Sequence, residues 1–172
     1  MDNNRIQTYI VSLLFCVFCL SLYGQNIKKH YVLKIQEKGN LYHFLPVSLF
    51  EDTDGEKLSY DLTYTTWNDS IVMNFSYIKT EPLLIDSIEY IAGNISLEGS
   101  VEKLYVEPTA KKWMHRYSLR GKADDFFQLY NSGTTPEILI YSKGITHPYP
   151  ANKANWRKYA PIGQKIFKMI RL

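Results

Sequence analysis

Hydrophobic and polar positions alternate with a period of two along most of this 172-residue chain. In the segments 58–65 and 71–77, every second residue is aliphatic or aromatic, and the residues between them are mainly polar. Successive side chains of a strand point to opposite faces, so this pattern predicts half-buried antiparallel strands. We expect strands at residues 31–36, 41–50, 58–67, 71–77, 83–91, 101–107, 111–120 and 137–141.

The spacing of the apolar residues becomes helical after residue 122. Apolar residues recur at helical spacing between Ala123 and Tyr130, and Gly133 is a typical helix terminator. The segment 153–172 has a second helical stripe, but Pro161 and Gly163 interrupt it and predict a broken C-terminal helix. The expected fold class is therefore a β-rich α+β domain with about six to eight antiparallel strands, as a meander, sandwich or partly open barrel, and one short late helix.

The first 24 residues have the pattern of a secretory signal peptide. Arg5 precedes an apolar stretch over residues 9–22, and Gly24 offers a cleavage point. We expect export across a bacterial inner membrane to the periplasm, the cell surface or the medium, with residues 25–172 as one β-rich globular domain. The alternative is an uncleaved N-terminal membrane anchor, which the lysine pair at 28–29 favours, although a span needs about 20 apolar residues.

Both cysteines of the chain, Cys16 and Cys19, lie inside this apolar stretch. A bacterial lipoprotein needs a small residue before its lipidated cysteine, whereas phenylalanine precedes both cysteines here. The sequence therefore predicts a mature chain without disulfides, lipidation or cysteine chemistry. Its core must then rely on apolar and aromatic packing, which fits an aromatic content of 15% that includes 14 tyrosines.

No strong catalytic or cofactor motif is present. The chain lacks a G-x-S-x-G nucleophile motif, a glycine-rich phosphate loop, a dinucleotide fingerprint and an H-E-x-x-H zinc motif. We therefore expect no cofactor and no metal. The four histidines are far apart in sequence, and we interpret the second and third as hydrogen-bonded core residues and the fourth as a loop residue. They are His30, His43, His115 and His147.

Charge is strongly segregated along the chain. The segment from Gln25 to Glu107 has seven Lys and 13 acids, whereas the segment from Pro108 to Leu172 has 12 Lys or Arg and three acids. This asymmetry predicts a surface for polyanions, unless distant segments interleave in space and give a mixed, solvated surface. The candidate polyanion-binding residues are Lys112, Arg116, Arg120, Arg157, Lys158, Lys165, Lys168 and Arg171.

These features favour a non-catalytic binding or envelope-associated domain whose partner is an anionic glycan, a lipid or another protein. Export argues against nucleic acid as the partner. The first alternative is a secreted glycan-active hydrolase with a carboxylate pair, and the second is a small outer-membrane β-barrel, against which the late helix and Pro46 argue. The candidate carboxylates of the hydrolase are Glu89, Glu98, Glu102 and Glu107.

Two tripeptides, Asp69-Ser70-Ile71 and Asp86-Ser87-Ile88, resemble the O-glycosylation acceptor motif of exported proteins of Bacteroidota. The sequence Leu-Tyr-Gly-Gln at residues 22–25 is similar to the end of export signals in that phylum. The resemblance implies export and says nothing about fold or activity.

Overall fold

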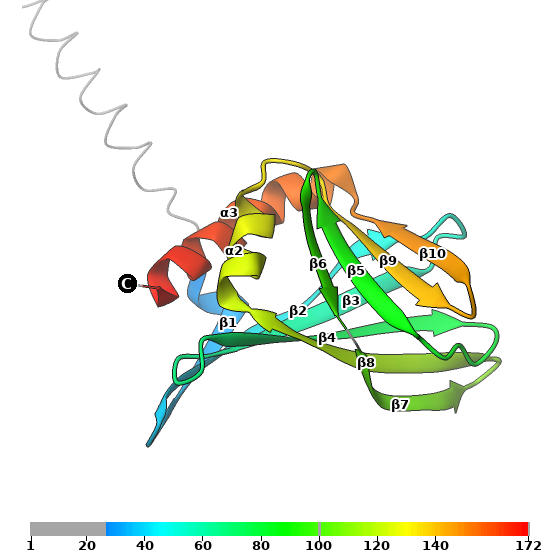
Figure 1. Cartoon of the computed structure of the whole chain (residues 1–172), viewed down its shortest axis with the longest axis horizontal. Helices are drawn as coiled ribbons and strands as arrows, with labels where there is room; N and C mark the ends of the chain where they lie inside the picture. Colours follow the sequence, from blue (N-terminus) through cyan, green and yellow to red (C-terminus); the bar gives the residue numbers. More distant parts are fainter. Residues whose placement is uncertain (1–26, 100, 172) are drawn as a thin grey trace, which may run out of the picture.

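The computed structural model describes residues 27–99 and 101–171, so the predicted signal peptide over residues 1–24 lies outside the described residues. The described chain forms a short 3-10 helix, η1 (Ile27–His30), and two α-helices, α2 (Ala123–Asn131) and α3 (Lys153–Ile170), around two antiparallel sheets (Figure 1). The strands are β1 (Tyr31–Gln36), β2 (Gly39–Glu51), β3 (Lys57–Thr65), β4 (Ser70–Lys79), β5 (Ser87–Ala92), β6 (Ile95–Gly99), β7 (Val101–Thr109), β8 (Lys112–Lys122), β9 (Glu137–Ser142) and β10 (Ile145–Pro150).

The larger sheet has six strands in the order β1-β2-β3-β4-β8-β7, and the smaller has four in the order β10-β9-β5-β6. The small sheet covers one half of the inner face of the large sheet, and α2 and α3 cover the other half (Figure 1). The predicted β-rich α+β class with a late helix is thereby confirmed.

Aromatic side chains fill the space between these layers. Phe50 of β2 packs against Tyr60 of β3 and Tyr90 of β5, with ring centroids 5.7 and 5.8 Å apart. Tyr130 of α2 packs against Phe167 of α3 at 5.1 Å. The abundant tyrosines therefore serve mainly the core, and the largest fully buried ones are Tyr60, Tyr77, Tyr90, Tyr117, Tyr130 and Tyr149.

The sequence pattern did not predict two of the strands. β6 follows directly on the turn at Gly93, and β10 covers the Pro-containing run that was interpreted as a loop around His147. β10 lies at the edge of the small sheet and has a hydrogen-bonded neighbour on one side only. Proline has no N–H, and an edge strand tolerates it at positions where the backbone nitrogen faces away from the neighbouring strand. The prediction of a loop at His147 was therefore wrong.

The C-terminal helix is continuous over Lys153–Ile170, so the predicted break at Pro161 and Gly163 was wrong. Proline has no N–H, so Pro161 cannot donate the helical hydrogen bond to the carbonyl group of Arg157. Both residues are exposed, and this carbonyl group can bond to water instead. Gly163 is buried where the helix approaches the ring of Tyr130. Among the described helices, none combines the length and apolar character needed to cross a membrane.

Candidate functional site

Helix α3 begins at a well-formed cap. The side chain of Asn152 accepts hydrogen bonds from the backbone N–H groups of Ala154 and Asn155, each at 3.1 Å. Asparagine is a preferred N-cap residue because its side-chain oxygen satisfies N–H groups that have no partner in the first turn. The apolar stripe of the helix then packs on the core with Trp156, Tyr159, Ile166, Phe167 and Ile170.

The opposite side of α3 carries only basic charges. Its cations recur at helical spacing and are all exposed, and the helix has no acidic residue. We call this surface the basic face of α3, and it consists of Lys153, Arg157, Lys158, Lys165, Lys168 and Arg171.

Most of these charges are not in ion pairs within the described part of the chain. The guanidinium group of Arg171 pairs with Asp124 of α2 and lies 4.8 Å from the ring centroid of Phe127. The other five cations of the basic face form no ion pair with any residue in the described part of the chain. Five uncompensated positive charges on one helix produce a local positive potential that favours an anionic partner.

A pocket of about 280 Å³ adjoins this face, and we call it the α3 pocket. It lies between the first half of α3 and the segment that follows α2. The indole N–H of Trp156 donates to the Thr134 carbonyl at 3.1 Å, and the Gln164 amide donates to the Tyr130 carbonyl at 2.7 Å, so these side chains are fixed. The lining residues are Tyr130, Gly133, Thr135, Lys153, Trp156, Arg157, Ala160, Pro161 and Gln164.

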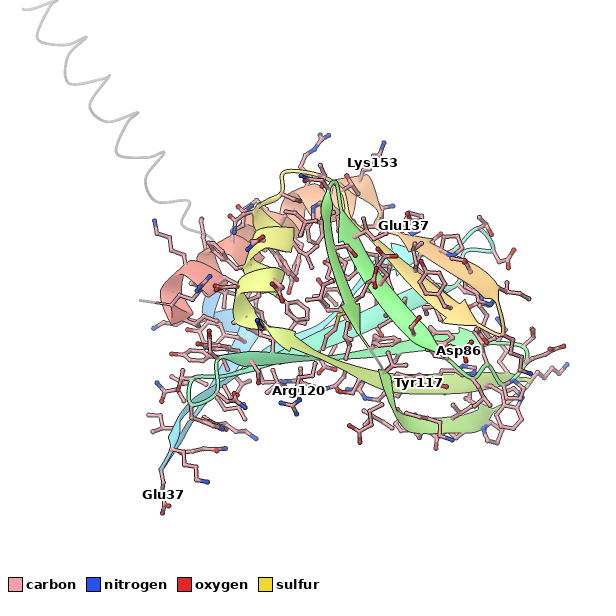
Figure 2. All side chains as sticks on the ribbon, in the orientation of Figure 1. Glu37, Asp86, Tyr117, Arg120, Glu137 and Lys153 are labelled. Atoms are coloured by element: carbon pink, nitrogen blue, oxygen red, sulfur yellow. The ribbon has the colours of Figure 1, made fainter. Side chains whose placement is uncertain are left out.

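The structure does not bring all eight predicted polyanion-binding residues together. Four of them, from Arg157 to Lys168, lie on α3, and Arg171 is its C-cap residue. Lys112, Arg116 and Arg120 belong to β8 of the large sheet. Arg120 and Lys153 mark opposite sides of the molecule (Figure 2). Lys153 was missed in the sequence, although it lies four residues before Arg157 and therefore on the same helical face.

The three cations of β8 differ in their partners. Lys112 pairs with Glu56. Arg116 donates to Asp61 at 2.6 Å and to the hydroxyl of Ser76 at 2.8 Å, and Asp61 is only 2% exposed. Arg120 is exposed and lies 3.4 Å from the Ser70 hydroxyl. Arg116 therefore balances a buried carboxylate of the sheet and is poorly placed to bind a free anion.

Two of the four candidate carboxylates form a cross-strand pair. Glu89 of β5 lies directly opposite Glu98 of β6, and both line a pocket of about 460 Å³ on the outer face of the small sheet. Glu89 accepts hydrogen bonds from the hydroxyls of Tyr141 at 2.8 Å and Ser96 at 2.6 Å. The bond to Glu89 raises the pKa of Tyr141.

The other two carboxylates, Glu102 and Glu107, lie on β7 of the large sheet. They belong to a different sheet from the cross-strand pair. Only Glu89 and Glu98 therefore remain as a candidate acid pair.

The histidines do not converge on a metal site. His115 is fully buried and its Nε2 accepts a hydrogen bond from the Leu83 N–H at 2.8 Å, which confirms its interpretation as a core histidine. His43 is only partly buried and bonds to Thr63 on the outer face of the large sheet, so its placement in the core was wrong. Within residues 27–99 and 101–171, no cluster of three or more potential metal ligands occurs.

No protein-family model, curated protein or solved structure gives a significant match to the chain. Its function therefore has to be inferred from the geometry of its own residues.

Proposed function

We propose that the protein is a non-catalytic binding domain of the bacterial cell envelope, and that it holds an anionic glycan along the basic face of α3. The observation that carries this proposal is the row of five exposed cations without an ion-pair partner in the described chain. An isolated exposed ion pair contributes only about 0–1 kcal/mol, so useful affinity requires several contacts along a repeating polyanion.

A glycan fits this surface better than a lipid bilayer does. The apolar side of α3 is buried against the core and cannot enter a membrane. The large hydrophobic residues that are exposed in the described chain lie on strands, turns and loops, and α3 has none of them. A helix that binds the membrane interface needs an exposed apolar face besides its basic face. Adsorption to anionic vesicles without polysaccharide binding would contradict the proposal.

The test is retention of the purified protein on an immobilised polyuronate compared with a neutral polysaccharide. We expect retention on the polyuronate that weakens as salt rises, because exposed charges are screened within about 10 Å at 0.1 M. Lys165→Glu and Lys168→Glu should each weaken retention, since both residues are exposed and unpaired. Lys143→Glu, in the β9–β10 turn, is the matched control with the same change in net charge. Equal retention of all three variants, or retention independent of salt, would contradict polyanion binding on α3.

A second candidate function is glycoside hydrolysis at Glu89 and Glu98. Directly opposed residues of an antiparallel pair have Cβ atoms about 4.5–5.5 Å apart, and retaining glycosidases place their two carboxyl groups about 5–5.5 Å apart. The hydroxyls of Ser96 and Tyr141 both donate to Glu89 and hold its carboxylate in place between the two strands. Release of reducing ends that Glu89→Gln abolishes and Glu137→Gln preserves would support this function. No release from any acidic or neutral polysaccharide tested would exclude it.

A further inference from the structure

The α3 pocket joins the basic face to a small, fixed apolar surface. Its volume of about 280 Å³ is just below the range of roughly 300–1,000 Å³ that is typical of small-molecule sites, so it suits one small group and not a polymer chain. Trp156 and Gln164 are held by the bonds to Thr134 and Tyr130 described above. The pocket therefore exists before a ligand binds, and little side-chain entropy has to be lost there.

The lining combines apolar and polar groups. Trp156, Ala160 and Pro161 give an apolar wall. The Tyr130 hydroxyl bonds to the Tyr60 hydroxyl at 2.6 Å inside the core, so Tyr130 presents only its ring to the pocket. Thr135 makes no side-chain hydrogen bond within residues 27–99 and 101–171, and its hydroxyl can serve a ligand. A ligand that fits has one apolar side and several hydrogen-bonding groups.

Two free cations lie at the same pocket. Lys153 and Arg157 are four residues apart on α3, which places their Cβ atoms about 5–6 Å apart on one side of the helix. Neither has an ion-pair partner among the described residues. One carboxylate or phosphate group can reach both side chains, and the planar guanidinium of Arg157 can bind it with two parallel hydrogen bonds.

We propose that the α3 pocket binds a single sugar residue that carries one anionic group, held between Lys153 and Arg157 with the sugar ring against Trp156 and Pro161. This inference rests on the proposed function, because the sugar would be one unit of the glycan that lies along the basic face. Lys158, Lys165 and Lys168 then contact charges on the neighbouring units and add affinity without selecting the sugar.

The test is calorimetric titration of the purified protein with four small probes: glucuronate, glucose 6-phosphate, glucose and inorganic phosphate. We expect glucuronate or glucose 6-phosphate to bind, the stronger of the two identifying the anionic group, and glucose and phosphate to bind at least about tenfold more weakly. Arg157→Gln should lower the affinity for the preferred sugar about tenfold, and Lys153→Gln should also lower it. Lys143→Gln, in the β9–β10 turn, is the control with the same change in charge and should leave this affinity unchanged.

The outcomes separate the pocket from the basic face. Retention on the polyuronate could depend on Lys165 and Lys168 while none of the monosaccharides binds. That result would overturn sugar binding in the α3 pocket and leave the proposed function standing. Equal binding of glucose and glucuronate would overturn the role of the two cations. Phosphate that binds as tightly as the sugars would reduce the pocket to an anion site and overturn recognition of the sugar ring.

Discussion

The neutral state of His115 is set by its surroundings. Its ring is fully buried and stacks on Tyr77, with centroids 4.7 Å apart, and its Nε2 accepts the Leu83 N–H. A nitrogen that accepts a hydrogen bond carries no proton, and burial lowers the pKa of His115 below its ordinary value of 6.5. The unfolded chain therefore binds more protons in mild acid. This contribution to stability is complete above about pH 6.5 and is lost as the pH falls through the folded pKa.

We expect the free energy of unfolding to fall between about pH 7 and pH 5, and His115→Phe to reduce that fall. The variant should also be about 1–3 kcal/mol less stable at pH 7, because the Leu83 N–H loses its acceptor. Urea unfolding across this pH range measures both effects. His43→Phe, at the partly buried histidine of the outer face, is the matched substitution and should cost less stability at pH 7, because His43 bonds only to the side chain of Thr63. If the free energy of unfolding of His115→Phe fell as much between pH 7 and pH 5 as that of the wild type, other groups would account for the fall.

His115 and His43 also show how well the alternation of apolar and polar residues predicts whether a single residue of a strand is buried. The prediction for His115 was right because β8 keeps a regular register with β4 on either side of it. The prediction for His43 was wrong because β2 has a bulge between Phe44 and Val47. Phe44 and Val47 both pair with inward-facing residues of β3, so both face inward although one has an even and the other an odd residue number. The odd-numbered positions before the bulge, including His43, therefore face outward. Pro46 lies in this bulge, and it is the one sequence feature that could have indicated it.

At the scale of elements, the packing of α3 on α2 outweighs the local preferences of its sequence. Gly163 disfavours a helix by about 1 kcal/mol relative to alanine, yet the helix passes through it. A Cβ atom at this position would come 2.6 Å from Cδ1 of Tyr130. That ring is fixed by its bond to Tyr60 and its contact with Trp156. The close approach of the two helices therefore requires glycine, which a pattern of residues on one helix cannot reveal.

Gly163→Ala should consequently destabilise the protein by about 1–3 kcal/mol, although alanine is the better helix former. Thermal or urea unfolding measures the change. Combining it with Tyr130→Leu should relieve the contact, so that the loss in the double variant is smaller than the sum of the two single losses. A stabilised Gly163→Ala variant would mean that the helices separate easily and that helix propensity dominates.

At the scale of the whole molecule, the two oppositely charged halves of the sequence are only partly mixed in space. Lys112 and Arg116 of the basic half pair with Glu56 and Asp61 of the acidic half across the large sheet. The sheet therefore neutralises part of the segregated charge, as expected where antiparallel strands bring distant segments together. Helix α3 lies outside this pairing, and the surplus of positive charge remains there. The sequence pointed to five of the six residues of the basic face, but it could not exclude Lys112 and Arg116, because strand order and helix placement decide which cations meet acids.

A buried group of tyrosine hydroxyls also ties the layers together. Tyr60 of β3 and Tyr130 of α2 share a hydrogen bond of 2.6 Å, and Tyr159 of α3 packs against Tyr130 at a centroid distance of 6.4 Å. Burial raises the pKa of Tyr60 and Tyr130 well above the ordinary value of 10.0, and that of Tyr159 to about 12. Above about pH 10 the unfolded chain loses these protons and the folded chain keeps them. Their contribution to stability is therefore complete below that pH and is lost as the pH rises towards the folded pKa values.

We expect the free energy of unfolding to fall steeply above about pH 10, with the absorbance of tyrosinate rising in the same cooperative step as the loss of structure. Tyr130→Phe removes one titrating hydroxyl and the bond to Tyr60, so it should cost about 1 kcal/mol at neutral pH and make the alkaline slope shallower by one proton. Tyr105→Phe is the control, because that ring is 39% exposed. Tyrosinate absorbance that rises near pH 10 without unfolding would show that solvent reaches these hydroxyls in the folded protein. The coupling of sheet and helices through them would then be wrong.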